Sequence, residues 1–144
     1  MIFEIEFGSE YCAGEGRLGR MCVGAHLRET FLSPVSGQPW READYERSWR
    51  EGVRRALEEG RGALITAASR RTIAVSCWPL YRVRGWVIAQ PRLLRPPPCW
   101  SWDEPWAHIP RRDPPLRGAR VPDYRAPVAD VEQWLEVVED LRGW

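Results

Sequence analysis

The chain has 144 residues, of which 21 are basic and 20 acidic, giving a formal net charge of +1. This length suits one domain with its own hydrophobic core, and the near-neutral balance excludes an overall basic field for a nucleic-acid backbone. All 21 basic residues are arginines, which excludes lysine-based catalysis. We expect a cytoplasmic protein, because no apolar run reaches the ~18 residues of a membrane span and the acidic N-terminus does not resemble a signal peptide.

The first part of the chain predicts two strands followed by a helix. Residues 2–7 and 20–28 each alternate between apolar and polar side chains, which is typical of half-buried strands. The Gly-rich stretch 14–19 between them lacks the spacing of a phosphate-binding loop, so we interpret it as a hairpin connection. After turn-forming residues at 33–39, apolar side chains three and four apart predict a helix over 41–59.

The middle of the chain predicts three further strands. Residues 62–68 form a short apolar run, and the longer apolar stretch 72–94 is interpreted as two strands joined near Arg84–Gly85. Because a proline removes one hydrogen-bond donor from a sheet, we expect Pro79 and Pro91 to lie at bulges or strand ends.

The last part combines a proline-rich segment with a second helix. Residues 95–127 contain eight prolines before Pro127 together with several tryptophans, so we expect a long loop without regular structure. An apolar stripe predicts a helix over 129–142. Together these elements predict one α+β domain over residues 1–144, with a mainly antiparallel sheet of about five strands, two amphipathic helices packed on it and a long Pro- and Trp-rich loop.

The stretch 96–113, PPPCWSWDEPWAHIPRRD, concentrates side chains that serve nucleophilic or metal chemistry. A Cys99–His108 hydrolase is one hypothesis, but no hydrolase signature or predicted helix N-terminus accompanies this cysteine. A metal site that includes Asp103 is another, but the spacing matches no standard zinc pattern. The four cysteines form no CxxC pair, and Cys77 lies in an apolar run typical of a core thiol. We therefore predict neither an enzyme nor a bound metal or cofactor.

Nucleic-acid binding is the alternative that stays open from the residues alone. Arginine and tryptophan together stack on bases and reach phosphates, and residues 111–120 form the one basic cluster of note. Acidic residues accompany the arginines on the other segments, so we interpret residues 111–120 as a solvated loop before a nucleic-acid contact. An Arg- and Trp-based module for RNA or single strands remains the alternative hypothesis.

Six segments follow one another in a recognisable order between residues 33 and 137. They are SPVSGQPW (33–40), DYERSWREGVRRAL (44–57), GALIT (62–66), WPLYRVRGWVIAQPRLL (78–94), PWAHIPRRD (105–113) and VPDYRAPVADVEQWL (121–135). This ordered series resembles the immunity proteins of bacterial contact-dependent growth inhibition systems and of related polymorphic-toxin loci. No single segment is diagnostic, and the resemblance rests on the series as a whole.

The resemblance implies a non-enzymatic cytoplasmic inhibitor. Such a protein binds the C-terminal toxin domain of a sibling cell's effector and occludes the active site of that domain. The resemblance implies no membrane partner. In one branch of the family the toxin is a ribonuclease of the ribonuclease A type. Tryptophan and arginine are frequent hot-spot residues, and acidic residues would face the basic surface of a nuclease. We therefore predict toxin contacts in the Trp-rich segment and the N-terminal loop. The predicted contact residues are Trp100, Trp102, Asp103, Glu104, Trp106, Glu10 and Glu15.

Overall fold

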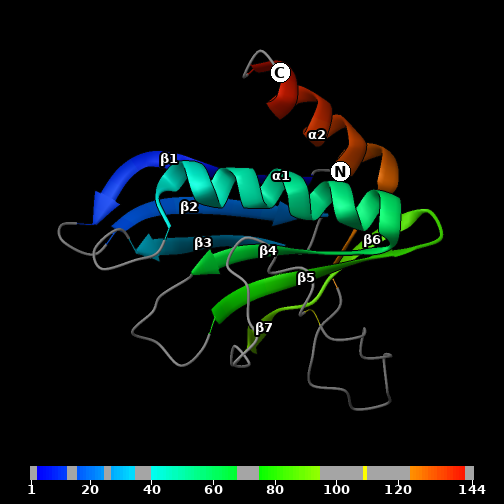
Figure 1. Cartoon of the computed structure of the whole chain (residues 1–144), viewed down its shortest axis with the longest axis horizontal. Helices are drawn as coiled ribbons and strands as arrows, with labels where there is room; N and C mark the ends of the chain where they lie inside the picture. Colours follow the sequence, from blue (N-terminus) through cyan, green and yellow to red (C-terminus); the bar gives the residue numbers. More distant parts are fainter. Residues whose placement is uncertain are drawn as a thin grey trace.

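The structure is a computed structural model with two antiparallel sheets and two helices (Figure 1). It describes residues 3–12, 16–24, 27–34, 40–67, 75–94, 109 and 124–141. The first sheet contains β1 (Phe3–Cys12), β2 (Gly16–Val23) and β3 (Leu27–Pro34). The second contains β4 (Arg61–Ala67), β5 (Val75–Val83), β6 (Trp86–Ala89), β7 (Arg92–Leu94) and β8 (Tyr124–Pro127). The helices are α1 (Glu42–Glu59) and α2 (Val128–Leu141). Within these ranges, neither helix is both long and apolar enough to cross a membrane.

The first sheet is an antiparallel meander in the order β1-β2-β3. Cys12 lies opposite Gly16, so the Gly-rich stretch belongs to a hairpin, as predicted. β1 and β2 extend further into the expected loop than the side-chain pattern indicates, and β3 at 27–34 was not predicted as a separate strand. Backbone pairing sustains these strands where glycine and polar residues break the alternation, because strand formation depends on neighbours more than on intrinsic preference.

The second sheet has the order β4-β5-β6-β8, with β7 also paired to β5, and all its pairings are antiparallel. The predicted α+β class with mainly antiparallel pairing is confirmed, and the strands divide between sheets of three and five. The expectation of no regular structure as far as residue 127 is wrong at its end, where β8 places Pro127 opposite Trp86 of β6. A strand from a distant part of the sequence supplies this pairing, which a local proline-rich pattern does not reveal.

The two prolines of the central region lie at one interruption of the second sheet. The Pro79 carbonyl in β5 accepts a hydrogen bond of 3.1 Å from the Gln90 N–H, at the break between β6 and β7. The N–H that Pro79 lacks would point to the same side of the strand. Pro91 lies in the break itself. Pro91 therefore agrees with the expectation of a strand end, whereas Pro79 does not, because it lies inside β5 and pairs with Ala63. It is tolerated there because its nitrogen faces the break between β6 and β7.

Helix α1 and strand β4 approach to backbone contact. A Cβ atom placed on Gly52 of α1 would lie 1.9 Å from the Ala63 carbonyl oxygen of β4. A Cβ atom on Gly62 of β4 would lie 1.8 Å from the Gly52 carbonyl oxygen. Gly60, at φ 90°, ends the helix in the left-handed conformation and leads directly into β4. The helix therefore rests on the strand that follows it with no side chain between the two glycines.

Aromatic rings connect β1 to both helices. The Phe7 ring of β1 lies 4.8 Å from the Trp49 ring of α1, measured between centroids. The Phe3 ring meets Trp134 of α2 edge to face at 5.5 Å. Such ring pairs add about 0.5–1.5 kcal/mol beyond their burial. β1 therefore fixes the positions of α1 and α2 relative to one another.

Replacing Trp49 by phenylalanine is expected to lower the free energy of unfolding by about 1–3 kcal/mol, because it removes the donor to a buried carbonyl. The Trp49 indole N–H donates to the Ile65 carbonyl oxygen of β4 at 2.7 Å. Urea unfolding measures the loss. The matched control is Trp134→Phe, since the Trp134 indole makes no hydrogen bond to another described residue and its replacement should have a smaller effect. Equal losses in the two variants would contradict the role of the hydrogen bond.

Candidate functional site

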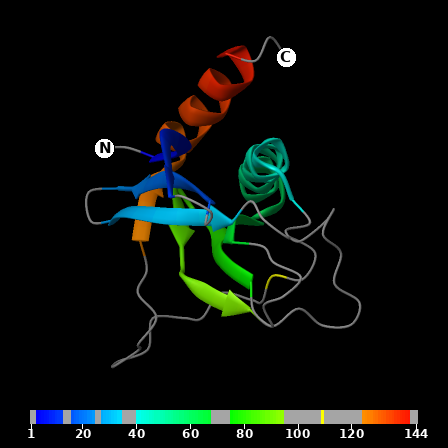
Figure 2. The same ribbon diagram turned by 90° about the vertical axis from the view of Figure 1, so that its left-hand side faces the viewer.

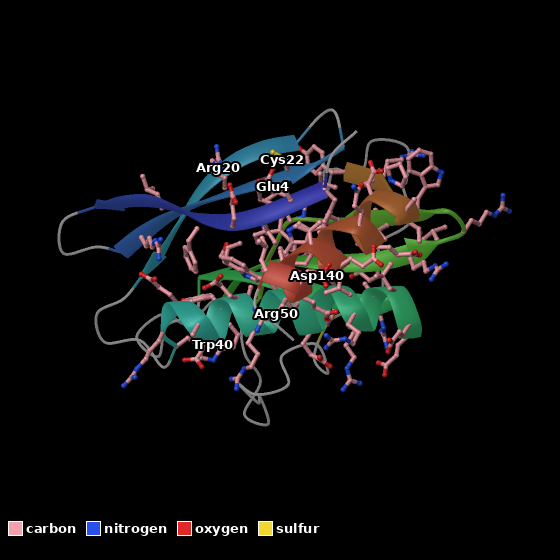
Figure 3. The ribbon with its side chains drawn as sticks, turned by 90° about the horizontal axis from the view of Figure 1, so that it is seen from above. Glu4, Arg20, Cys22, Trp40, Arg50 and Asp140 are labelled. Atoms are coloured by element: carbon pink, nitrogen blue, oxygen red, sulfur yellow. The ribbon has the colours of Figure 1, made fainter. Side chains whose placement is uncertain are left out.

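Seen from above, α2 passes between β1 and α1 (Figure 3). Two cavities lie along this helix. A cavity of about 340 Å³ separates β1 from α2, and a second of about 360 Å³ lies between α2, β1 and α1. The two cavities share lining residues, and we call them together the α2 groove. The shared residues are Ile5, Glu6, Trp134, Val138 and Leu141.

The apolar wall of the α2 groove is exposed. Val137 is 48 % exposed and Leu141 is 80 % exposed, one helical turn apart on α2. With Trp86, they are the large hydrophobic side chains that stand exposed in the described part of the chain. Figure 2 shows that the C-terminal half of α2 extends beyond the two sheets, so the sheets do not cover these side chains. Apolar side chains paired on one helix face in this way are typical of a binding surface.

Three carboxyl groups line the cavity between β1 and α2. Glu4 and Glu6 lie two residues apart on the same face of β1, and Asp130 lines the cavity from the first turn of α2. Burial raises the pKa of Glu4, repulsion from Glu6 raises it further, and Arg20 opposes both effects. Arg20 also forms an ion pair with Glu6. The Asp130 Oδ2 atom is buried without a hydrogen-bond partner among the described residues. The cavity therefore carries negative charge that its own residues neutralise only in part.

A stripe of acidic side chains runs along the outer face of α2, where it lines neither cavity of the α2 groove. Glu132, Glu136 and Asp140 follow one another at intervals of four residues, are exposed, and form no ion pair with the rest of the described chain. Glu139 differs, because it binds Arg54 of α1 and links the two helices. In all, α2 contains five acidic residues and no basic residue. Figure 3 shows Asp140 on the last turn of this helix.

Asp140 opposes the dipole of α2, because it lies in the last turn of the helix. The C-terminal end of a helix carries partial negative charge, so an acidic residue there costs about 0.3–1 kcal/mol. At the equivalent end of α1, Arg82 donates to the Leu57 carbonyl oxygen at 2.7 Å. The last turn of α2 contains no basic residue, although it contains Glu139 and Asp140. Residues that oppose the local preferences of a helix occur chiefly at functional surfaces. This favours binding of a partner as the explanation for an acidic residue at the end of α2.

A smaller surface of opposite charge lies at the turn between β5 and β6. Arg84 adopts a left-handed conformation with φ 57°, which is uncommon outside glycine and asparagine. The neighbouring Trp86 is 38 % exposed, and the Arg125 guanidinium lies 5.7 Å from its ring centroid. This Arg84–Trp86–Arg125 surface combines cationic and aromatic groups, as both nucleic acids and acidic proteins require.

The contact residues predicted from sequence fall almost entirely outside the described residues. Trp100, Trp102, Asp103, Glu104, Trp106 and Glu15 lie outside them, as do Cys99 and His108. Glu10 lies on β1, but its side chain is not described. These contacts therefore stay predictions. Within the described ranges, no three His, Cys, Asp or Glu side chains gather in a group that could hold a metal ion.

Sequence reasoning missed the α2 groove. The one available signal was the number of acidic residues in the predicted helix 129–142, whose apolar stripe served only to place the helix. The groove requires β1 and α2 to lie side by side, although they come from opposite ends of the chain.

Cys77 is expected to resist alkylation in the folded protein, even at pH 9. Burial raises the pKa of its thiol to about 12, so the reactive thiolate is scarce, and the side chain is only 1 % exposed. Iodoacetamide labelling followed by peptide mass spectrometry should modify the partly exposed Cys22 first. Cys77 should react only after unfolding in urea. Rapid modification of native Cys77 would contradict its position in the core.

Comparison with known proteins agrees with the resemblance noted in the sequence. The family model described as the CdiI N-terminal domain matches residues 35–134, which is more than half of the chain. The fold is similar to a solved structure of a CdiA-CT/CdiI toxin and immunity complex from Enterobacter cloacae, with a TM-score of 0.82 over 96 % of this chain and 99 % of that chain. The two share 18 % sequence identity, so this second likeness concerns the fold alone. No curated protein matches the chain. By the match to its family model, the chain belongs to the CdiI family, the immunity proteins of contact-dependent growth inhibition.

Proposed function

We propose that this protein binds the toxin domain of a cognate CdiA-type effector and neutralises it by occluding its active site. The observation that carries the proposal is the CdiI family match over residues 35–134. The fold supports it, because the similar solved structure is named as a toxin and immunity complex. Inhibition of this kind requires a rigid binding surface and no catalytic group, which suits a protein that acts by contact rather than by turnover.

Co-expression with the toxin domain encoded next to this protein tests the proposal. Cells that express the toxin alone should stop growing, and cells that also express this protein should grow normally. An immunity protein from a different toxin locus serves as the control and should not protect. Continued growth arrest, together with separate elution of the two proteins from a sizing column, would overturn the proposed function.

We further propose that the toxin is a ribonuclease and that the inhibitor covers its active site. The purified toxin domain should cleave cellular RNA, and cleavage should stop when the inhibitor reaches an equimolar concentration. A toxin that forms the complex but still cleaves its substrate would rule out occlusion. A toxin that leaves RNA intact would rule out ribonuclease chemistry while leaving the immunity function in place.

The Trp-rich segment stays a proposed part of the toxin contact. Tryptophans at interfaces are frequent hot spots, each worth about 2 kcal/mol or more on truncation. Trp102→Ala and Trp106→Ala should therefore weaken toxin binding if these rings touch the toxin. The readout is the dissociation constant measured beside the thermal midpoint. A fall in the thermal midpoint at unchanged affinity would assign the rings to packing instead.

Nucleic-acid binding is a second candidate, favoured by the exposed Arg84–Trp86–Arg125 surface. Such binding would weaken steeply with salt, because arginines release counterions from the phosphate backbone. Fluorescence anisotropy with a labelled single-stranded RNA at low salt tests it directly. We expect no binding, and an affinity lost in the Arg125→Glu variant would instead support this alternative.

A further inference from the structure

We propose that the α2 groove receives a positively charged segment of the toxin domain, with an apolar side chain of that segment seated against Val137 and Leu141. The inference rests on the proposed immunity function and deepens it, because it assigns the docking surface and the chemistry of the partner.

The first argument is the exposed apolar pair. Val137 and Leu141 stand one turn apart on the part of α2 that extends beyond the sheets (Figure 2). Leu141 lines both cavities of the groove, so an apolar side chain that contacts it reaches both of them. Covering apolar surface of this kind is the main driving force of protein association.

The second argument is the charge around the groove. Glu4, Glu6 and Asp130 line the cavity between β1 and α2, and Arg20 pairs with only one of them. The buried Oδ2 of Asp130 has no hydrogen-bond donor among the described residues, so an incoming arginine or lysine would supply one. The cavity beside α1 is mixed in charge, because Glu46 lines it together with Arg17 and Arg50. The excess of carboxylates therefore lies between β1 and α2, where a positively charged partner segment matches the surface in sign.

The same charges argue against a second copy of this chain as the occupant. Two α2 helices that packed on each other would bring together surfaces with five acidic and no basic residues each. Like charges placed opposite one another disfavour association. We therefore expect the protein alone to sediment as a monomer, and the toxin segment to be the partner that covers α2. A dimer that Leu141→Ser converts to monomers would instead assign the groove to self-association.

The test compares toxin binding between the wild type and a groove variant that lacks two of the carboxylates lining the cavity between β1 and α2, Glu4→Gln with Asp130→Asn. Both side chains are partly exposed and form no ion pair with a described residue, so the fold should tolerate the change. We expect the dissociation constant for an active-site-inactivated toxin domain to rise roughly 100-fold. A second variant, Leu141→Ser, leaves all charges in place and should weaken binding roughly 10-fold by removing the apolar contact.

The matched control neutralises two acidic residues at the end of the other helix. Glu58→Gln with Glu59→Gln on α1 makes the same change in net charge at exposed positions that do not line either cavity. Its dissociation constant should stay within about threefold of the wild type, because distant exposed charges are screened. The inference fails if the control weakens binding as much as the groove variant, or if both groove variants bind like the wild type. The proposed function fails separately, if the wild type neither binds nor protects.

Photo-crosslinking identifies the occupant. A benzophenone amino acid at position 141 should crosslink to the toxin in the complex, and the same group at position 58 should not. Mass spectrometry of the crosslinked peptide should find a toxin segment rich in arginine and lysine. A crosslink to an acidic toxin segment would overturn the assigned chemistry even if the surface is correct.

Discussion

Replacing Gly52 by alanine is expected to lower the free energy of unfolding by about 3 kcal/mol or more. The added methyl group would lie 1.9 Å from the Ala63 carbonyl oxygen, a distance that real Cβ atoms do not tolerate. The obstacle is backbone, which can move only by separating α1 from β4. Helix propensity alone predicts the opposite sign, because alanine is favoured over glycine within a helix by about 1 kcal/mol. The experiment therefore decides between local preference and tertiary contact.

Urea unfolding followed by circular dichroism measures this effect, with Gly85→Ala as the matched control. Gly85 lies in the turn between β5 and β6, where an added Cβ meets nothing within 4 Å and the backbone φ is ordinary for other residues. That variant should change the free energy of unfolding by no more than about 0.5 kcal/mol. A Gly52→Ala protein as stable as the wild type, or more so, would show that α1 and β4 are not in backbone contact.

The helices could be predicted from the sequence because their evidence is local. The apolar stripe over 41–59 gave α1, which spans Glu42–Glu59, and the stripe over 129–142 gave α2, which spans Val128–Leu141. Gly60 marked the end of α1 correctly. Side chains three and four apart lie on one face whatever the rest of the chain does, so these elements need no tertiary information.

The contacts between elements could not be predicted in the same way. Gly52 is one glycine within a helical pattern, and Gly62 is one glycine within an apolar run. Their role follows only from α1 lying on β4. β8, which contains Pro127, is a strand because it pairs with β6. The division into two sheets likewise depends on pairings that a single sequence does not contain.

The candidate site could likewise be predicted from the sequence only in part. The acidic residues of α2 are visible in the sequence, but only the fold shows that Asp130 lies beside Glu4 and Glu6 of β1. The predicted Trp-rich contact segment and the α2 groove are separate proposals about the same toxin. Charge variants at the α2 groove test one proposal, and tryptophan variants between residues 100 and 106 test the other. The two tests are independent, because the variants change different residues. A large toxin interface would include both.

The acidic stripe of α2 is expected to act mainly on the rate at which the toxin is captured. Glu132→Gln, Glu136→Gln and Asp140→Asn together should slow association about tenfold at low salt, because attraction over a distance guides the encounter of opposite charges. In about 1 M salt the Debye length is about 3 Å, so the rates of the variant and the wild type should converge. Stopped-flow fluorescence of the toxin complex at both salt concentrations measures the two rates.

Two comparisons separate steering from damage to the fold. Leu141→Ser should mainly raise the dissociation rate, because an apolar contact acts after the encounter. The triple variant should melt at about the same temperature as the wild type, since the loss of Asp140 from the unfavourable end of the helix offsets the loss of Glu132 near its favourable end. An association rate that falls equally at low and high salt would contradict steering. If the predicted pattern holds, α2 gives up a little stability at its acidic end in exchange for rapid capture of a positively charged toxin.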